Sequence, residues 1–358
     1  MIAVIADDIT GAAEMAGIAH RLGLRVKLTM QPESASDCDV LVIATDTRSM
    51  TEEEAAAGSA RVAGALGAMP EVDSLFKKTD SALRGHVVAE LEAILANTGY
   101  RKALYLPANP SKGRTIRDGV YYIGGKPLHE TDFSFDPEFP AFSSRLIERL
   151  PMCEEKKITC ADAESENDVA KAVETAADDI LLAGAADMFT AFLRRKFPAC
   201  RETSDCLCAF NLADSLIICG STQSKPIDCG IATSYMPTEV YDEKTSADGW
   251  TARLVKDYND SHAMIIAVRD RHRTGKHIAV YLRETMARIS DALVSCHRPA
   301  ELVIEGGATA FAILNRLGWN SFTITEETAL GVIRMQADNG THVTMKPGSY
   351  PWGNLFRQ

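Results

Sequence analysis

Short apolar runs alternate with helical patterns along the chain, and this alternation restricts the fold more than any other feature. Apolar runs cover residues 2–6, 40–44 and 103–106 in the first half and 216–219, 264–268 and 302–305 in the second. Amphipathic segments of helical period separate them. Strand, helix, strand in regular order builds a parallel sheet with helices on both faces. Polar residues follow these runs, so we expect them to meet at the carboxyl edge of a sheet, where ligands bind.

Chain length predicts two domains. The 358 residues exceed the roughly 250 to 300 at which single hydrophobic cores stop growing. Periodicity lapses between residues 197 and 211. We therefore predict an α/β protein of two domains, 1–205 and 206–358, each a largely parallel sheet flanked by helices.

Residues 76–85 carry the densest mixture of charged and hydroxyl groups. An apolar run, 72–76, leads in and a helical pattern from Val87 leads out, which predicts a polar turn between a strand and a helix. The guanidinium of Arg84 offers a planar fork to a carboxylate or phosphate, and Asp80 can accept a hydrogen bond from a hydroxyl. The turn suits an anionic, hydroxylated small molecule. The alternative is a solvated loop with one surface ion pair.

A second polar turn follows the first apolar run. Asp7 and Asp8 end the strand, and Thr10 is expected to cap the helix that follows. Two adjacent carboxylates repel each other, so they usually serve a hydroxyl, a metal or a cation. A capping acid at the helix dipole is the alternative, and it explains one aspartate but hardly both.

Residues 107–136 interrupt the alternation with prolines and glycines. A hairpin is expected around Gly124 and Gly125. A loop this long in a compact domain is usually functional. Its basic residues, Arg114 among them, favour a lid or wall over the acid-binding turn, and a plain surface elaboration is the alternative.

Glycine-rich turns characterise the second half. Gly306 and Gly307 lie between an apolar run and a helical pattern, where glycine allows close backbone approach to a ligand and a helix N-terminus favours anions. Ser221 lies in a hydroxyl-rich turn, and Gly348 lies in the last glycine-rich turn. Tight packing is the alternative.

Composition excludes several classes of function. A formal charge of −11 argues against nucleic acid as a partner, because such binding depends on basic patches. No apolar run approaches membrane-spanning length, and Asp7 and Asp8 break the apolar start, so no signal peptide is expected. The nine cysteines have no paired C-x-x-C spacing. We therefore predict reduced thiols, a cytoplasmic protein and no metal site, despite Cys206 and Cys208.

The chain resembles the four-carbon acid-sugar kinase family, whose members include threonate, erythronate and 3-oxo-tetronate kinases. Two stretches carry the resemblance most clearly, Ala6-Asp7-Asp8-Ile9-Thr10-Gly11-Ala12 and Lys78-Thr79-Asp80-Ser81-Ala82-Leu83-Arg84-Gly85. The other matching stretches, in family order, are 45–48, 107–115, 118–119, 126–131, 162–163, 220–222, 306–309 and 346–350. The last departs from the family's Lys-Ser-Gly-Asn-Phe-Gly pattern, and the chain is shorter than typical members.

The resemblance implies an ATP-dependent kinase that phosphorylates a hydroxyl of a four-carbon sugar acid in an interdomain cleft. It places the sugar acid in the first domain and ATP, with Mg²⁺ carried on its phosphates, in the second. Asp80 and Asp8 compete for the role of orienting or deprotonating the hydroxyl. The expected substrate-binding residues are Asp7, Asp8, Lys78, Asp80, Arg84 and Arg114. The expected nucleotide-binding residues are Ser221, Gly306, Gly307, Thr309 and Gly348.

Two rival functions remain. A non-catalytic acid-sugar sensor would keep the first domain and have lost nucleotide binding, in line with the altered last turn. A dehydrogenase is disfavoured because no G-x-G-x-x-G follows the first strand. No phosphate-binding P-loop motif is present either. The sequence fixes neither the stereochemistry of the acid nor the oligomeric state, for which a homodimer is one option.

Overall fold

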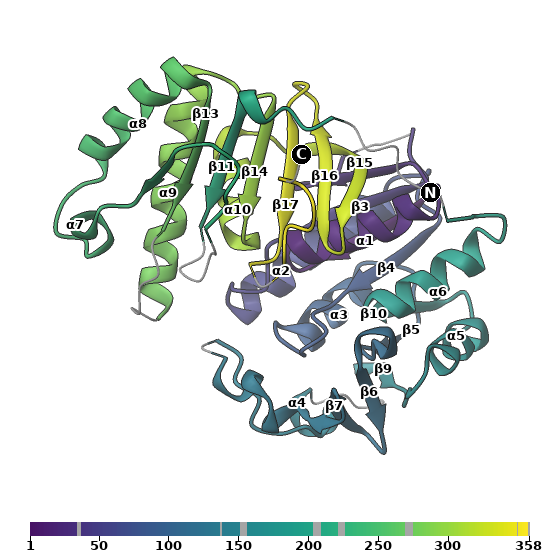
Figure 1. Ribbon diagram of the computed structural model, residues 1–358. Coiled ribbons are helices and arrows are strands. Elements are labelled where there is room, and N and C mark those ends of the chain that lie inside the picture. The colour runs from purple at the N-terminus through teal and green to yellow at the C-terminus, as the bar shows by residue number, and fades with distance from the viewer. Residues whose placement is uncertain are drawn as a thin grey trace. The chain divides into compact units, whose positions relative to one another are not determined.

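The computed structural model describes residues 1–33, 37–136, 138–150, 156–202, 209–220, 226–268, 275–348 and 350–356. The chain divides into two compact units, Met1–Thr203 and Ser204–Gln358 (Figure 1). The predicted boundary near residue 205 falls on residues 203–208, outside the described residues. Among the described helices, none combines the length and the apolar character needed to cross a membrane.

A parallel sheet forms the centre of the first unit. Its strand order is β2-β3-β1-β4-β10-β5-β9, and each neighbouring pair runs parallel. The strands are β1 (Ile2–Ala6), β2 (Val26–Thr29), β3 (Val40–Ala44), β4 (Ser74–Lys78), β5 (Lys102–Leu106), β9 (Ile158–Cys160) and β10 (Ile180–Gly184). Every residue of β1, β3 and β4 is buried. Strands β1 and β3 are continuous apolar runs because both faces of a parallel sheet are covered, whereas β4 ends in two buried lysines.

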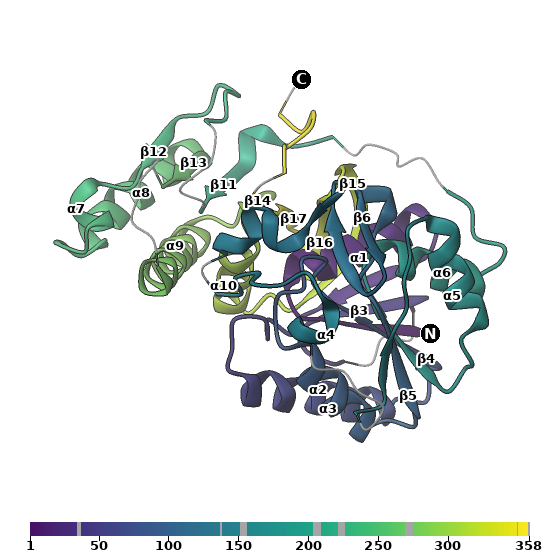
Figure 2. The same cartoon turned by 90° about the horizontal axis from the view of Figure 1, so that it is seen from below.

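Helices cover both faces of this sheet. They are α1 (Ile9–Arg21), α2 (Glu52–Gly67), α3 (Val87–Ala96), α5 (Glu166–Thr175) and α6 (Ala186–Lys196). Helices α2 and α3 contact each other on one face, while α6 contacts α1 and α5 on the other (Figure 2). The predicted cap of α1 was wrong. The helix begins at Ile9, so Asp8 is its N-cap and accepts from the backbone N–H of Gly11, while Thr10 lies in the first turn.

A three-stranded arm connects β5 to β9. It contains β6 (Arg114–Arg117), β7 (Val120–Ile123), β8 (Lys126–Pro127) and the short helix α4 (Leu146–Arg149). Strand β7 pairs antiparallel with β6 on one side and with β8 on the other. The predicted hairpin is therefore confirmed, with Gly124 and Gly125 at its turn. Here "the arm" means residues 107–150.

The strands of the second unit are mostly parallel and follow the order β12-β13-β11-β14-β17-β16-β15. The strands are β11 (Ser215–Cys219), β12 (Thr233–Tyr235), β13 (Ala263–Ala267), β14 (Glu301–Glu305), β15 (Ser321–Ala329), β16 (Val332–Ala337) and β17 (His342–Lys346). In the described part of this unit, the antiparallel pairings are those of β16 with β15 and with β17. The helices are α7 (Thr238–Tyr241), α8 (Asp248–Ser261), α9 (Lys276–Cys296) and α10 (Gly307–Leu317), and α9 contacts α8 and α10.

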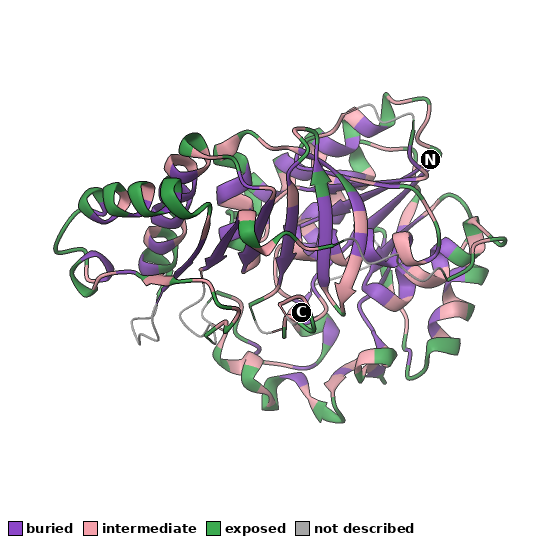
Figure 3. Ribbon diagram, turned by 45° about the horizontal axis from the view of Figure 1, so that its top comes forward, coloured by how far each residue is buried: buried purple, intermediate pink, exposed green. Residues whose placement is uncertain are grey.

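Burial follows the sheets. In Figure 3 the strands of both units are mostly buried, while α8 exposes one side to solvent. One buried ion cluster joins three strands of the second sheet: Arg334 of β16 pairs with Glu301 of β14 and Glu326 of β15. Removal of one partner from such a cluster leaves a buried charge uncompensated, which is strongly destabilising. The predicted α/β class, with a largely parallel sheet and flanking helices in each unit, is confirmed.

Candidate active site

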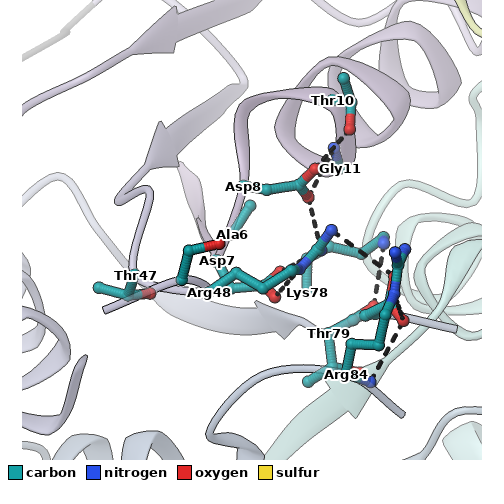
Figure 4. Close-up of polar contacts among 12 residues, drawn as sticks. Ala6, Asp7, Asp8, Thr10, Gly11, Thr47, Arg48, Lys78, Thr79 and Arg84 are labelled. Carbon is teal, nitrogen blue, oxygen red and sulfur yellow. Dashed lines mark hydrogen bonds and ion pairs between the residues drawn. The ribbon is translucent and has the colours of Figure 1, made fainter. Parts of the chain in front are cut away.

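The carboxyl ends of β1, β3 and β4 lie next to one another in the first unit. Ala6 at the end of β1 pairs with Ala44 of β3 and with Lys78 of β4. The residues that follow these strand ends are therefore brought together, as expected for a parallel sheet. Asp7 and Asp8 follow β1 and Arg48 follows β3 (Figure 4). Asp80 follows β4.

Arg48 connects the acidic residues of this edge. Its Nε lies 2.7 Å from Oδ2 of Asp7, and its Nη2 lies 2.7 Å from Oδ1 of Asp8. Its Nη1 lies 3.7 Å from Oδ1 of Asp80. One guanidinium thus neutralises carboxylates from two strand ends. Sequence reasoning did not choose Arg48 as a site residue, although its position after a buried strand is the same signal that selected Asp7 and Asp8.

Asp80 and Arg84 form a two-point ion pair within one turn. Arg84 Nη2 lies 2.8 Å from Oδ1 and Arg84 Nε lies 2.9 Å from Oδ2 of Asp80. The backbone N–H groups of Ala82 and Arg84 also donate to Oδ2. A second carboxylate, that of Asp136 on the arm, lies 3.5 Å from Arg84 Nη1. The fork of Arg84 is already engaged by carboxylates of this chain.

These contacts set the protonation of the aspartates. Burial alone raises the pKa of Asp80, but the charges of Arg48, Arg84 and Lys78 outweigh it and hold that pKa far below its usual range. Burial also opposes ionisation of Asp8, and Arg48, Lys78 and the hydroxyl of Thr10 lower its pKa overall. Both side chains are therefore anions at neutral pH, suited to accepting hydrogen bonds from hydroxyl groups.

Lys77 and Lys78 lie in the last positions of β4, which corrects the prediction that the strand spans 72–76 and that both belong to the turn. A lysine side chain can be buried in this way where a carboxylate forms an ion pair with its ammonium group. Successive side chains of a strand point to opposite faces. Lys77 Nζ lies 2.8 Å from Glu90 of α3, whereas Lys78 Nζ lies 3.4 Å from Glu14 of α1. Of the two, Lys78 reaches the candidate site.

The arm contributes further polar groups to the same edge. Arg114 donates to the hydroxyl of Ser81, and the hydroxyl of Tyr121 donates to the Ser81 carbonyl at 2.6 Å. The guanidinium carbons of Arg84 and Arg114 each lie 5.8 Å from the ring centroid of Phe133. The expected substrate-binding residues Asp7, Asp8, Lys78, Asp80, Arg84 and Arg114 all belong to this site or to the arm beside it.

The second unit gathers four of the five predicted nucleotide residues at the carboxyl ends of β14 and β17. Gly306 precedes α10 with φ +98°, and its N–H donates to the carbonyl of Lys346 at 3.0 Å. Gly307 is the first residue of α10, and Thr309 is buried in its first turn. Lys346 Nζ lies 2.7 Å from Glu305 and 3.4 Å from the carbonyl of Gly348. Ser221 lies outside the described residues.

The fold and the charged strand edge define an α/β protein with a polar candidate site at the carboxyl ends of its strands. The chain belongs to the family of the sugar-binding N-terminal domain, whose model matches residues 2–188. This match covers the whole candidate site of the first unit.

Curated relatives confirm the resemblance to acid-sugar kinases. A D-threonate kinase of Salmonella typhimurium is 36% identical over 150 residues, which are 40% of this chain and 35% of the relative. A D-erythronate kinase of Heliobacterium modesticaldum is 34% identical over 155 residues, 41% of this chain and 35% of the relative. A 3-oxo-tetronate kinase of Methylobacterium radiotolerans is 32% identical over 156 residues, which are 41% of this chain and 36% of the relative. The match thus spans about a third of the length of these relatives.

Solved structures support the fold. A Haemophilus influenzae protein matches with a TM-score of 0.73 at 19% identity, over 99% of this chain and 98% of that one. A Salmonella typhimurium protein matches with a TM-score of 0.78 at 18% identity, over 99% of this chain and 97% of that one. At these identities the likeness concerns the fold alone.

Proposed function

We propose that the protein is an ATP-dependent kinase that phosphorylates a hydroxyl of a four-carbon sugar acid of the threonate, erythronate or 3-oxo-tetronate type. The observation that carries the proposal is the cluster in which Arg48 holds Asp7, Asp8 and Asp80 together at one strand edge. It lies inside the segment matched by the sugar-binding family model. The names of the kinase relatives supply the reaction class.

The contacts of the charged side chains support an anionic polyol as the ligand. Five carboxylates and five cationic side chains at this edge are engaged in ion pairs or hydrogen bonds. The carboxylates are Asp7, Asp8, Glu14, Asp80 and Asp136, and the cations are Arg48, Lys78, Arg84, Lys112 and Arg114. A carboxylate ligand binds by replacing the protein's own carboxylates as the ion-pair partner of these cations. The ligand's hydroxyl groups then donate hydrogen bonds to the aspartates that have lost their cationic partners. Arg84 and Arg114 are suited to the ligand carboxylate because a guanidinium binds it at two points.

The reaction is an in-line displacement. A hydroxyl oxygen of the sugar acid forms a bond to the γ-phosphorus of ATP, the bond to the β–γ bridging oxygen breaks, and ADP leaves. The hydroxyl proton passes to Asp8, Asp80 or solvent. Because both aspartates have a lowered pKa, we assign them mainly to orienting the hydroxyl. A loose transition state requires little proton removal before the phosphoryl group has moved.

We place ATP on the second unit, against Gly306, Gly307, Thr309 and Gly348, with Ser221 as a further contact. Two observations support this placement. The positive φ of Gly306 bends the chain away before α10, which leaves the N–H groups of its first turn to be met by an anion. The ammonium of Lys346 lies beside that turn, paired with Glu305. When bound, Mg²⁺ on the phosphates neutralises their charge; we assign no side chain to it.

A coupled assay of ADP release tests the proposal. Purified protein is incubated with Mg-ATP and, in turn, with D- and L-threonate, D- and L-erythronate and a 3-oxo-tetronate, and with gluconate as a longer control acid. We expect ADP release that depends on one of the four-carbon acids. Asp8→Asn should reduce it without unfolding the protein. No release above background with any of them contradicts the proposal.

The second candidate is a non-catalytic acid-sugar binding protein. The altered last turn favours it, since Tyr350 packs so closely on Gly331 that a Cβ there would lie 2.6 Å from the ring. Calorimetry with ADP separates the candidates, because the sensor binds a sugar acid but no nucleotide. The cytoplasmic location and the homodimer are further proposals, checked by fractionation and by light scattering.

A further inference from the structure

Glu14 of α1 joins two lysines from different parts of the first unit. Its Oε1 lies 2.5 Å from Nζ of Lys112 on the arm, and its Oε2 lies 3.4 Å from Nζ of Lys78 at the end of β4. The side chain of Lys78 is 4% exposed, whereas those of Glu14 and Lys112 are about a quarter exposed. A single carboxylate thus lies between two cations, one of them deeply buried.

The surrounding backbone is shaped for the Lys78 ammonium. A Cβ added to Gly11, one turn before Glu14, would lie 3.3 Å from Nζ of Lys78 and 2.5 Å from Oδ1 of Asp8. Glycine is thus the residue that lets Lys78 lie beside the first turn of α1. The ammonium also donates to the carbonyl of Thr79 at 2.9 Å. Burial and these contacts fix the position of Lys78, which makes it part of a built site rather than a surface charge.

We propose that Lys78 and Lys112 form a phosphate-binding subsite, and that Glu14 occupies this subsite as an internal competitor while no phosphate is bound. The inference rests on the proposed kinase function, in which the subsite receives the phosphoryl group of the phosphorylated sugar acid. Lysine binds phosphate as a point charge, and the planar guanidinium groups of Arg84 and Arg114 can bind a carboxylate at two points. We assign the phosphate end of the product to the two lysines and its carboxylate end to the two arginines.

Among the acids of the site named above, Glu14 is the least tightly held. Asp80 is held by two arginines and two backbone N–H groups, and Asp8 is held by Arg48 and the helix N-terminus. Glu14 has a longer side chain, is partly exposed and lies on the surface of a helix, so rotation carries its carboxylate into solvent. A phosphate that replaces it regains contacts with both lysines.

Removal of an ordinary binding residue weakens ligand binding, whereas removal of the Glu14 carboxylate is expected to strengthen phosphate binding. An internal competitor reduces apparent affinity by the fraction of time that it occupies the subsite. If Glu14 occupies the subsite about 90 to 95% of the time, Glu14→Gln should bind phosphate about 10- to 20-fold more tightly. Lys112→Ala should bind it at least about 10-fold more weakly, because one of two charge-assisted contacts is lost.

Calorimetry of the full chain with inorganic phosphate, at constant ionic strength, provides the test. Glu92→Gln is the matched control, since Glu92 pairs with Lys156 at 3.1 Å in the same unit, outside the site; its phosphate affinity should equal that of the wild type. Unchanged or weaker binding by a folded Glu14→Gln protein overturns the inference. If that variant does not fold, Glu14→Asp replaces it, because a shorter carboxylate reaches Lys112 less well and should also tighten binding.

Turnover measured on the same proteins separates the two proposals. If the wild type transfers phosphate to a four-carbon acid while Glu14→Gln binds phosphate no more tightly, the kinase proposal stands and the subsite proposal is wrong. If the wild type shows no turnover while Glu14→Gln binds phosphate more tightly, the subsite proposal stands and the kinase proposal is wrong.

Discussion

Asp80 and Arg84, four residues apart in one turn, hold each other by two parallel contacts of 2.8 and 2.9 Å. Sequence reasoning gave the two residues separate tasks, Asp80 for a hydroxyl and Arg84 for a carboxylate. In the proposed kinase, a sugar acid would have to exchange contacts with both side chains at once. A carboxylate bound to Arg84 would then free oxygen lone pairs of Asp80 for the hydroxyls of the acid.

Asp80→Asn should lower kcat at least about 100-fold, the low end for groups that assist proton movement or orient a nucleophile. The amide keeps the shape of the side chain but loses the charge that holds Arg84 and Arg48. The coupled ADP-release assay measures the effect, and circular dichroism checks folding. A kcat within a few-fold of wild type would make Asp80 structural and leave Asp8 as the orienting residue.

Arg84→Ala should raise KM for the sugar acid by a much larger factor than KM for ATP. The side chain offers its fork to the acid's carboxylate, and loss of a binding contact common to ground and transition states appears in KM. Steady-state kinetics with each substrate varied in turn measure both constants. Equal effects on the two KM values would assign Arg84 to the transferred phosphoryl group.

Arg48→Ala should lower the free energy of unfolding by about 3 to 5 kcal/mol, because it leaves buried carboxylates without their counter-charge. Urea denaturation at neutral pH measures the loss. Arg101→Ala is the control: Arg101 forms a 2.7 Å pair with Asp179, but both side chains are exposed, so its unfolding midpoint should hardly change. Similar losses in the two variants would contradict the bridging role of Arg48.

Stability should fall in acid through the carboxylates of the site. The pKa values of Asp8, Glu14 and Asp80 are all lowered in the folded protein, against about 3.9 for aspartate and 4.3 for glutamate in an unfolded chain. Their contribution is complete above about pH 5 and is lost as the pH falls below about 4. The difference in unfolding free energy between wild type and Asp80→Asn should therefore shrink from pH 5 to pH 2. A constant difference over this range refutes the assignment.

Gly306→Ala should weaken ADP binding. Its φ of +98° strains any residue with a Cβ by about 1 to 3 kcal/mol, and the strain displaces the first turn of α10. Gly340→Ala is the matched control, because Gly340 has φ +90° and open space around its Cβ position. Both variants should lose stability, and only Gly306→Ala should lose ADP affinity in calorimetry. Equal ADP affinities would remove this turn from the nucleotide site.

The strands and the charged edge could be predicted from the sequence because apolar runs and strand-end positions are local signals. Asp7, Asp8 and Asp80 were identified in this way. The ion-pair partner of these aspartates could not be predicted, because Arg48 lies more than 30 residues along the chain from each carboxylate that it contacts. No periodicity encodes such a pairing.

Two expectations based on the local preferences of single residues were wrong. Lys77 and Lys78 were assigned to a turn because lysine rarely lies in a buried strand, yet Glu90 and Glu14 on separate helices neutralise them there. Thr10 was expected to cap α1, but aspartate is a stronger N-cap than threonine. Asp8 takes that position, and the helix begins two residues earlier than expected.

The arm leaves the sheet after β5 and returns to it at β9, and these two strands are hydrogen-bonded neighbours. Its two ends are therefore anchored side by side on the same scaffold. Such a segment can be exchanged as a cassette, because a replacement of different length or sequence closes on the same pair of strands. Lys112, Arg114 and Asp136 would be exchanged with it, whereas Arg48 and the strand-end aspartates would stay. Arm exchange between relatives is thus a route to altered acid selectivity on an unchanged sheet.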